Sequence, residues 1–592
     1  MSNVPSVSLK TLDEKRLYQR SFIALSIVTW VYLIVRAYSA PLVFDEATSY
    51  FLFVKNGTFW PGQAYWSANN HFLNSLLGHG SVLVFGPQEW ALRLPSLIAF
   101  PFYALFGFRL MSKLECAVLR WWAFVLFFTS HGILEFFGYA RGYGLMLCFI
   151  LGSLWYLRAL YLQFRLSTLY CLLVFSFLAL LSNLSCLPLI GLLLLSSLYL
   201  SWRSSKSLGL KIRLTALTVL PFLFHLWWIF QLREHRELYY GGQSGFISDS
   251  LNSLVSMVLH PDLSPYIFVA AGILFLLSLI ISKAWHNFQK LNIESWSLLS
   301  FFLITAFYPI GHWLIQLNFP YDRALIYWLV FGLVIQFIWL NKLLQQGHKS
   351  MLLTLSWTVV FPLLFLAQLS LNRVSFSGWS KEQIPDRFYQ KLTNLNAENI
   401  GGSYLHIPQW NFLHTKIKGS LPAIIISDSP SLDYRLSEKK GLQKWAENYQ
   451  PIDSNNAGLY LLQRKSFKEK IALKRIPLAA QERHQQGFPI YKSSDSLRVD
   501  AISGRVKIKT ENAPNQLCIA LQGLSKNGEQ VYWQAFRARD YLSHKKEWQD
   551  WRLFVSLENL PQSSDRLKLF VWNPENETFS LEASEWTLWK LK

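Results

Sequence analysis

"SFIALSIVTWVYLIVRAY", residues 21–38, is the first of eleven long apolar stretches in this chain of 592 residues. A helix needs roughly 20 mostly apolar residues to cross the hydrocarbon core of a bilayer. Stretches of this kind recur to about residue 371, after which the sequence is polar and charged. The pattern predicts a polytopic α-helical membrane protein with about 11 transmembrane helices and additional soluble mass.

The eleven expected spans are joined mostly by short connections. Their approximate bounds are 21–38, 92–111, 118–137, 142–162, 166–181, 184–202, 214–230, 264–281, 296–317, 323–340 and 351–371. A twelfth stretch, 71–85, is apolar but short, and Asn74, His79 and two glycines interrupt it. We expect this stretch to form an interfacial or re-entrant helix on the outer side of the membrane rather than a span.

The basic residues indicate the orientation of the chain. With eleven spans, the basic loops fall on the same side as the basic N-terminus, as the positive-inside rule requires. We therefore expect a multi-pass protein of the bacterial cytoplasmic (inner) membrane with a cytoplasmic N-terminus and a periplasmic C-terminal region. The formal net charge is +20, and many of the basic residues lie in such short clusters between apolar runs, which favours the bilayer over nucleic acid as a partner.

The polar C-terminal region is expected to hold two soluble units after a transmembrane domain at 1–371. Residues 372–475 mix helical patterns with short apolar strands such as "AIIIS" and "GLYLL", which is typical of an α/β domain. Residues 484–592 carry alternating runs such as "RVKIKT" and "QLCIALQG", which predict a β-sandwich. The six tryptophans of that region are expected mostly in its core, with stacking on sugar rings as the alternative.

One acidic pair stands out in the apolar part. The first 371 residues contain only thirteen Asp or Glu, and Asp45 and Glu46 lie adjacent in "VFDEATSYF", just after the first apolar stretch. Placing a charged carboxylate at the edge of the hydrocarbon costs free energy unless the group is paired or hydrated. The presence of two such groups therefore favours a functional role. The alternative is that Asp45 is the N-cap of a helix beginning at Glu46.

Other polar residues are expected at the same outer face: Asn70, His71, Tyr139, Arg141, Tyr143 and Arg323. Each has a structural alternative. The arginines could extend along the helix ends to the interface, and His71 could simply begin a helix. Carboxylates and arginines around one cavity nevertheless suit a base that acts beside a phosphate.

The order of four segments resembles a known superfamily. "FDEATSYF", "NNHFLNSLL", "FGPQEWALRLPSLIAF" and "GYARGYGLML" resemble the bacterial GT-C glycosyltransferases related to protein O-mannosyltransferases and the lipid A aminoarabinose transferase. The similarity covers roughly residues 21–162, with weaker support to residue 371. Phe72 stands where the family usually has proline.

The resemblance implies an inverting glycosyltransferase that moves a hexose or pentose from a polyprenyl-phosphate-linked donor to a glycan, lipid or protein acceptor on the outer face. It implies Asp45 as the catalytic base with Glu46 beside it, and Arg141 and Arg323 as contacts to the donor phosphate. We expect the remaining polar residues of the outer face to bind substrate. No cofactor is expected with certainty, and a divalent cation beside the carboxylates stays open.

Two other classes of protein remain as alternatives. A transporter or flippase of lipid-linked sugars also has many helices, but it would place functional charges near the middle of the bilayer and show internal repeats. An O-antigen-type polymerase or ligase would differ mainly in whether its donor carries one sugar or a chain. The position of the charges at helix ends favours the glycosyltransferase.

Overall fold

The computed structural model divides into two compact units. It describes residues 9–592 except 205–206, 260–262, 282–292, 368–378, 420, 427–429, 456–457, 485–486, 493–498, 512–515, 539–546, 558–559 and 562–563. The helical unit comprises Met1–Ser39, Gly57–Gly86 and Trp90–Arg373, and the strand-rich unit comprises Ala40–Asn56, Pro87–Glu89 and Val374–Lys592. Two segments of the long loop after the first expected span therefore belong to the same unit as the C-terminal region.

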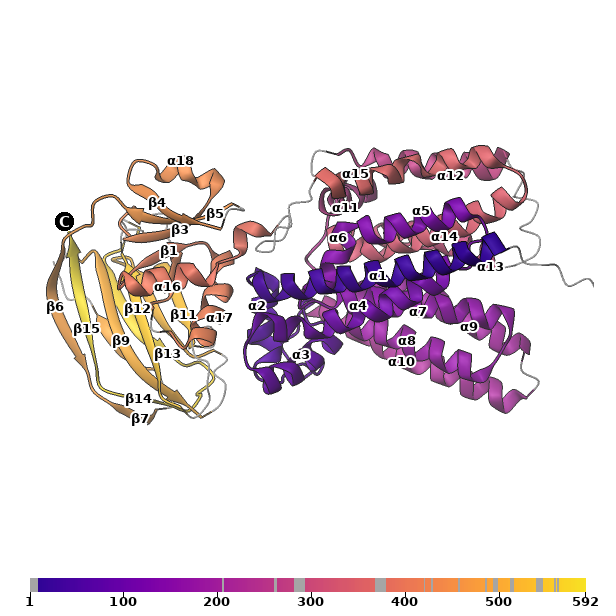
Figure 1. The fold of residues 1–592 in the computed structure, drawn as a ribbon. Helices are drawn as coiled ribbons and strands as arrows, with labels where there is room; N and C mark the ends of the chain where they lie inside the picture. Colours follow the sequence, from indigo (N-terminus) through magenta and orange to yellow (C-terminus); the bar gives the residue numbers. More distant parts are fainter. Residues whose placement is uncertain are drawn as a thin grey trace, which may run out of the picture. The chain divides into compact units, whose positions relative to one another are not determined.

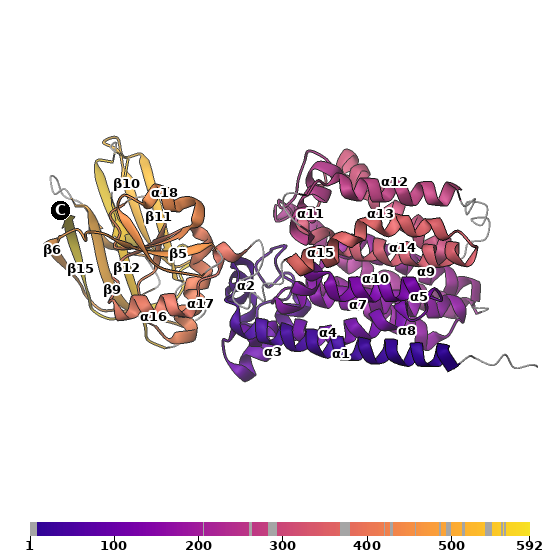
Figure 2. The ribbon, with the colours of Figure 1, turned by 45° about the horizontal axis from the view of Figure 1, so that its top comes forward.

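Long helices run side by side in the helical unit (Figures 1 and 2). The helices are α1 (Leu9–Ser39), α3 (Phe72–Phe85), α4 (Glu89–Met111), α5 (Ala117–Thr129), α6 (His131–Leu134), η2 (Glu135–Gly138), α7 (Tyr143–Leu162), α8 (Leu166–Ser182), η3 (Leu184–Cys186), α9 (Leu187–Ser204), α10 (Leu208–Glu234), η4 (Phe246–Leu251), α11 (Asn252–Val258), α12 (Tyr266–Ile281), α13 (Ile293–Ile315), η6 (Asp322–Leu325), α14 (Ile326–Gln345), η7 (Lys349–Val359) and α15 (Val360–Ala367).

Helices occupy all eleven stretches that the sequence predicts as spans. Among the described residues, seven helices are long and apolar enough to cross a membrane, and the bent pair Ala117–Thr129 and His131–Gly138 makes eight if it is one span. The shorter apolar helices are Phe72–Phe85, Leu166–Ser182, Tyr266–Leu277 and Leu352–Leu366. The chain is thus a multi-pass membrane protein, and the expected number of about 11 spans stays a prediction.

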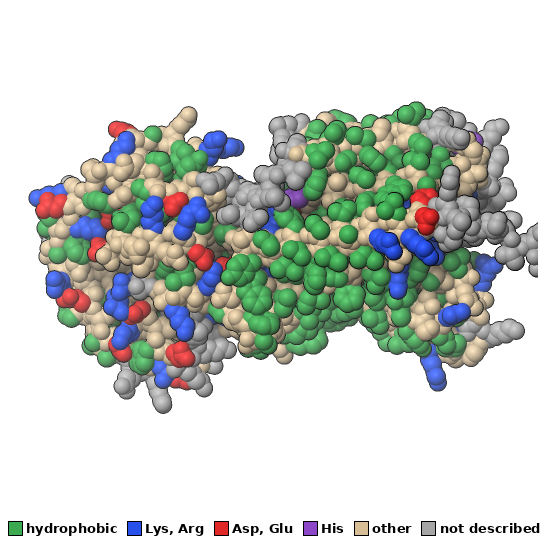
Figure 3. All heavy atoms as spheres, viewed as in Figure 1, with side chains coloured by type: hydrophobic (Ala, Val, Ile, Leu, Met, Phe, Trp, Pro, Cys, Tyr) green, Lys and Arg blue, Asp and Glu red, His purple; other side chains and the backbone are tan. Residues whose placement is uncertain are grey.

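The surface of the helical unit is that of a protein surrounded by lipid. Hydrophobic side chains cover the visible face of this unit, whereas acidic and basic side chains are scattered over the strand-rich unit (Figure 3). On α10, for example, Leu220 is 65% exposed and Phe230 is 54% exposed. A soluble protein rarely exposes so large a contiguous apolar surface.

The strand-rich unit contains a mixed α/β sheet with strand order β2-β1-β3-β5-β4. β1 pairs in parallel with β2 and β3, while β5 pairs antiparallel with β3 and β4. The elements of this part are α2 (Phe44–Ser49), η1 (Tyr50–Val54), η8 (Ser380–Glu382), α16 (Asp386–Asn394), β1 (Ile400–Gly402), η9 (Tyr404–His406), α17 (Ile407–Ile417), β2 (Ile424–Ile426), β3 (Tyr434–Glu438), η10 (Lys439–Gly441), α18 (Leu442–Trp445), β4 (Tyr449–Ser454) and β5 (Leu459–Arg464).

Two further sheets form the expected β-sandwich. One has the order β11-β10-β13-β8, and the other has the order β6-β15-β9-β14-β7 with β12 paired to β9. The strands are β6 (Lys470–Leu478), β7 (Gln481–His484), β8 (Pro489–Lys492), β9 (Ala501–Thr510), β10 (Cys518–Leu524), β11 (Gln530–Arg537), β12 (Gln549–Ser556), β13 (Arg566–Trp572), β14 (Phe579–Leu581) and β15 (Ser584–Leu591). The domain bounds 1–371, 372–475 and 484–592 stay predictions, and β6 begins ahead of the last of them.

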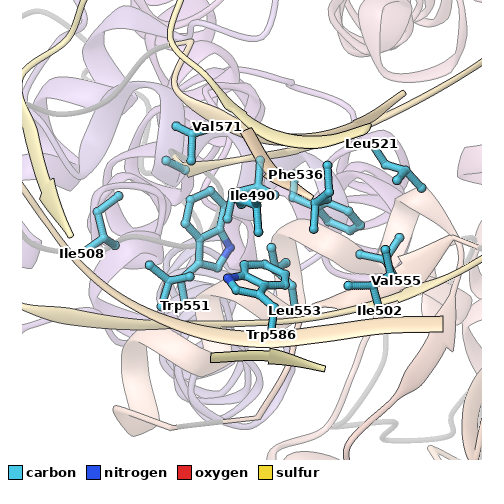
Figure 4. Packing of buried hydrophobic residues seen from close by; sticks show 14 of the residues in the cluster. Ile490, Ile502, Ile508, Leu521, Phe536, Trp551, Leu553, Val555, Val571 and Trp586 are labelled. Carbon is cyan, nitrogen blue, oxygen red and sulfur yellow. The ribbon is translucent and has the colours of Figure 1, made fainter. Parts of the chain in front are cut away.

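The sandwich core is built around two tryptophans. Trp551 and Trp586 are buried and lie between residues of both sheets (Figure 4). Three other tryptophans, Trp533, Trp548 and Trp572, are exposed. The expectation that most of the six tryptophans would be core residues therefore holds for only part of them.

A buried histidine makes the stability of the strand-rich unit sensitive to pH. Burial lowers the pKa of His406 to about 4, and its Nδ1 accepts a hydrogen bond from the Ser403 amide at 3.1 Å. As the pH falls below about 6.5, this histidine binds a proton in the unfolded chain but stays neutral in the folded chain. The free energy of unfolding therefore decreases until the pH reaches about 4. We expect a loss of about 3 kcal/mol over this window.

His406→Gln tests this prediction, because glutamine can cap the same helix start without titrating. Thermal unfolding of the full chain, followed by near-ultraviolet circular dichroism at pH 7 and pH 4.5, should show a smaller pH dependence in the variant. An unchanged pH dependence would contradict the assignment to His406.

Candidate functional site

Helix α2 carries the acidic pair, and Glu46 rather than Asp45 caps it. The helix begins at Phe44 with Val43 as the N-cap residue, and Glu46 Oε2 accepts a hydrogen bond from the Val43 amide at 3.0 Å. Asp45 as the N-cap of a helix beginning at Glu46 is therefore wrong. Glu46 is 1% exposed, whereas Asp45 is only half-buried. Of the two carboxylates, Asp45 is the more accessible to a substrate.

Residues far along the chain hold α2 in the strand-rich unit. The Phe44 amide donates to Glu382 Oε2 at 3.0 Å, and the buried Gln383 side chain donates to the Pro41 carbonyl at 2.8 Å. The Tyr50 ring packs edge-on against Phe412 with centroids 5.1 Å apart. The position of Asp45 thus depends on the C-terminal region, which no local sequence pattern indicated.

Arg141 lies in the helical unit between η2 and α7, and it is only 4% exposed. Its Nη2 donates to Asn69 Oδ1 at 2.8 Å, and the Ser96 hydroxyl donates to its backbone carbonyl at 3.2 Å. The alternative of a side chain extended to the interface is therefore wrong for Arg141. The Asn69 side chain thus contacts the buried guanidinium, and the Ser96 hydroxyl holds the backbone of the same residue.

The "NNH" segment supplies neighbours of Arg141. His71 is the N-cap residue of α3, as the helix-start alternative predicted, and its buried ring lies edge-on to Tyr143 at 5.2 Å. Asn70 donates to the Phe59 carbonyl at 3.0 Å and accepts from the Ser75 hydroxyl at 3.3 Å. The Asn70 amide thus secures the loop to α3, and Asn69 is the residue that contacts the arginine.

Gly142 makes the close packing around Arg141 possible. A Cβ at this position would lie 1.8 Å from the Ser182 carbonyl oxygen and 3.0 Å from the His71 Cβ. The start of α7 and the end of α8 can therefore approach each other only with glycine here.

We expect Gly142→Ala to lower the melting temperature and the yield of folded protein strongly, because backbone must move to admit the methyl group. Gly80→Ala is the matched control, since a Cβ on Gly80 in α3 meets no atom within 4 Å and alanine favours a helix interior. Differential scanning fluorimetry of both purified variants decides the question. Equal melting temperatures would contradict the steric argument.

Arg323 lies at the start of η6 beside a second tyrosine. The Tyr240 hydroxyl donates to Asp322 Oδ2 at 2.7 Å, and the Arg323 guanidinium lies 5.3 Å from the Tyr240 ring centroid. Burial and the neighbouring Asp322 carboxylate raise the pKa of Tyr240, and Tyr143 adds to the shift. Tyr240 therefore contacts both Asp322 and Arg323 at the start of η6.

Sequence reasoning missed a buried ion pair. Arg36 on α1 is 2% exposed, and its Nη2 lies 2.8 Å from Glu135 Oε1. His131 Nδ1 lies 3.4 Å from the same Glu135 oxygen, and Arg36 also donates to the Tyr32 hydroxyl at 2.8 Å. Tyr139, which was expected at the substrate site, is 1% exposed. An arginine at the end of a span is most simply interpreted as interfacial, so the sequence held no signal for this pair.

Removing one partner of this pair should destabilise the protein. We expect Arg36→Met to cost about 3–5 kcal/mol, because it leaves the Glu135 carboxylate buried without its counter-charge. Arg36→Met with Glu135→Leu should recover part of that loss. Glu14→Gln is the control, because the Arg120–Glu14 pair is partly exposed and should contribute less than about 1 kcal/mol. Urea unfolding in mixed micelles measures all three, and equal losses in the single variants would contradict the prediction.

The His, Cys, Asp and Glu side chains of the described residues give little support to a binding site for a divalent cation. Within the described ranges of the chain, His, Cys, Asp and Glu form no group of three or more that could hold a metal ion. Glu46, one of the two expected carboxylates, is buried and accepts the Val43 amide.

No protein-family model and no curated protein matches the chain. A comparison with solved structures finds the arabinosyltransferase EmbB from Mycobacterium smegmatis at 10% identity and a TM-score of 0.31, covering 96% of this chain and 64% of that one. The chain thus spans less than two thirds of EmbB. ArnT from Cupriavidus metallidurans is found at 13% identity, covering 76% of this chain and 98% of that one. Its TM-score is 0.34 in the apo state and 0.36 with undecaprenyl phosphate bound.

EmbB and ArnT are both members of the GT-C superfamily. In structure comparison, this chain is similar to both proteins over most of its length.

Proposed function

We propose that this chain is an inverting glycosyltransferase that moves a sugar from a polyprenyl-phosphate-linked donor to an acceptor at the membrane surface. The observation that carries the proposal is the buried guanidinium of Arg141, held by Asn69 at 2.8 Å beside His71 and Tyr143. A guanidinium presents a planar fork of N–H donors that matches a phosphate, so a buried arginine that a side-chain hydrogen bond holds in place suits an anionic ligand. The wide apolar surface of the same unit suits a donor with a long lipid tail.

The reaction forms one bond and breaks another at the anomeric carbon. The acceptor oxygen attacks this carbon from the face opposite the lipid phosphate, and the bond between the carbon and the phosphate oxygen breaks with its electron pair remaining on the phosphate. Asp45 takes the acceptor's proton. The guanidinium groups of Arg141 and Arg323 stabilise the charge that grows on the leaving phosphate.

The two carboxylates have different tasks in this proposal. A phosphate leaves without a general acid, so a second proton-transferring carboxylate is not needed, unlike in glycosidases. Glu46 accepts the Val43 amide and orients α2, which presents Asp45. The sugar is already activated on its lipid, so the reaction needs no nucleotide.

Transfer by purified protein in lipid vesicles tests the proposal. Each member of a panel of radiolabelled polyprenyl-phosphate monosaccharides is supplied with a mixed extract of bacterial envelope glycans, lipids and proteins as acceptors. We expect one donor to transfer its label to an acceptor, with the configuration at the anomeric carbon inverted. Movement of a labelled lipid across the vesicle membrane without transfer would overturn the proposal in favour of a flippase. Transfer only from donors that carry a preassembled sugar chain would favour the polymerase or ligase.

A further inference from the structure

A second candidate site lies inside the helical unit, away from the residues described above. A cavity of about 430 Å³ is lined by residues of α4, α5, α7, α13 and α14. This volume falls within the range of about 300–1,000 Å³ that is typical of small-molecule sites. None of the residues assigned to the candidate functional site lines it.

The cavity extends from the middle of the bundle toward the end at which α7 finishes. From α7 it takes Leu151, Leu154, Leu157 and Arg158, which run from the middle of that helix toward its C-terminal end. Arg141 precedes the first residue of α7. The cavity therefore reaches the end of α7 that is distant from Arg141, where the loop between α4 and α5 supplies Lys113, Leu114 and Glu115 to its lining.

The walls are apolar and the charged lining residues are mainly basic. Leu126, Phe331 and Ile338 are among the wall residues, while Lys113, Arg158 and Lys342 are basic. Glu115 is the single carboxylate that lines the cavity. Within the part of the chain that the structure describes, none of the three basic side chains forms an ion pair, and Lys342 lies over the Trp339 ring at 5.2 Å.

Hydrogen bonds fix the loop at the charged end of the cavity. Asn341 Oδ1 accepts hydrogen bonds from the Glu115 amide at 2.9 Å and from the Cys116 amide at 3.1 Å. These bonds cap the start of α5 and attach the connecting loop to α14. Lys342, which follows Asn341, is thereby held beside the loop that carries Lys113.

We propose that this cavity binds an anionic phospholipid of the surrounding membrane, with an acyl chain in the apolar interior and the phosphate at Arg158 and Lys342. An acyl chain matches the leucine and phenylalanine walls. Cationic side chains at the end of membrane helices attract anionic headgroups, and Arg and Lys are the side chains that bind phosphate most strongly. A water-soluble phosphate compound would leave the apolar interior unfilled. This proposal does not depend on the transferase activity.

Photolabelling of the full chain tests the proposal. The purified protein is placed in nanodiscs of phosphatidylcholine that contain a trace of phosphatidylglycerol with a photoactivatable group in its acyl chain. Labelled peptides are then identified by mass spectrometry. We expect phosphatidylglycerol to label α7 and α14 in the cavity, and matched photoactivatable phosphatidylcholine to label them more weakly.

Two variants separate the headgroup from the acyl chain. Arg158→Gln with Lys342→Gln should lower labelling by phosphatidylglycerol about tenfold, because two cations near the phosphate are lost. Leu154→Trp should lower labelling by filling the cavity. Arg165→Gln is the control, because this exposed arginine follows α7 and does not line the cavity.

The outcomes are distinguishable. Equal labelling by both phospholipids, or labelling by phosphatidylglycerol that survives the double glutamine substitution, would overturn the proposal. Labelling that is insensitive to Leu154→Trp would also overturn it, because the chain would then lie on the outer surface of the bundle. Transfer activity measured on the same samples shows separately whether the proposed function holds.

Discussion

Asp45→Asn is expected to abolish sugar transfer, lowering the turnover number by about 10²–10⁴-fold. Asparagine has the size and shape of aspartate but cannot accept the acceptor's proton. Asp45 lies at the second position of α2, where the cap is already supplied by Glu46. The substitution should therefore leave the helix and the affinity for undecaprenyl phosphate unchanged.

Glu46→Gln is the matched control for Asp45→Asn. The glutamine oxygen can still accept the Val43 amide, so we expect α2 to keep its start and transfer to keep most of its rate. Single-turnover transfer and filter binding of labelled undecaprenyl phosphate measure the two effects separately. If Asp45→Asn transferred sugar at the wild-type rate, Asp45 would not be the base. If Glu46→Gln were the inactive variant, the roles of the two carboxylates would be exchanged.

Arg141→Gln is expected to lower kcat/KM by about 10²–10³-fold, which is the effect of removing one group that stabilises developing charge. The guanidinium is 4% exposed, so its interaction with a phosphate is poorly screened by water. We also expect weaker binding of undecaprenyl phosphate, because the charge contacts the phosphate in the donor as well as in the transition state. Arg141→Lys should recover only part of the activity, since a point charge replaces a planar fork of donors.

Arg233→Gln is the control for a lost positive charge in the same unit. Arg233 lies exposed near the end of α10 and donates to the Ile315 carbonyl at 3.2 Å. We expect this variant to transfer sugar normally. Melting temperatures of all three variants show whether a loss of activity reflects unfolding. Normal kcat/KM in a stable Arg141→Gln variant would remove Arg141 from the reaction.

Elements of regular structure could be predicted from the sequence because their signal is local. Helices occupy the predicted apolar stretches, since a buried or lipid-facing helix needs a continuous run of apolar residues. The strands of the sandwich follow the alternating runs "RVKIKT" and "QLCIALQG" as β9 and β10, because a strand exposes alternate residues to its two faces. The break at Ser130 between α5 and α6 was not predicted, because the apolar run continues through it.

The candidate site could be predicted only in part. Composition singled out Asp45 and Glu46. Their different contacts depend on where α2 begins, and this helix begins at Phe44, two residues before the start that the N-cap alternative placed at Glu46. Asn70 was predicted to bind substrate, but the asparagine that contacts Arg141 is Asn69, and only side-chain directions distinguish two adjacent asparagines.

By itself, the sequence determined that this chain spans a membrane many times, ends in a region of strands, and places a rare acidic pair after its first span. Only the tertiary structure decided that residues 40–56 belong with the C-terminal unit, through contacts such as that between Phe44 and Glu382, which lie 338 positions apart. It also decided that Arg36 pairs with Glu135 across 99 positions. The physical reason is that hydropathy and periodicity act over a few turns of one segment, whereas hydrogen bonds and ion pairs form between whichever groups the packed chain brings together.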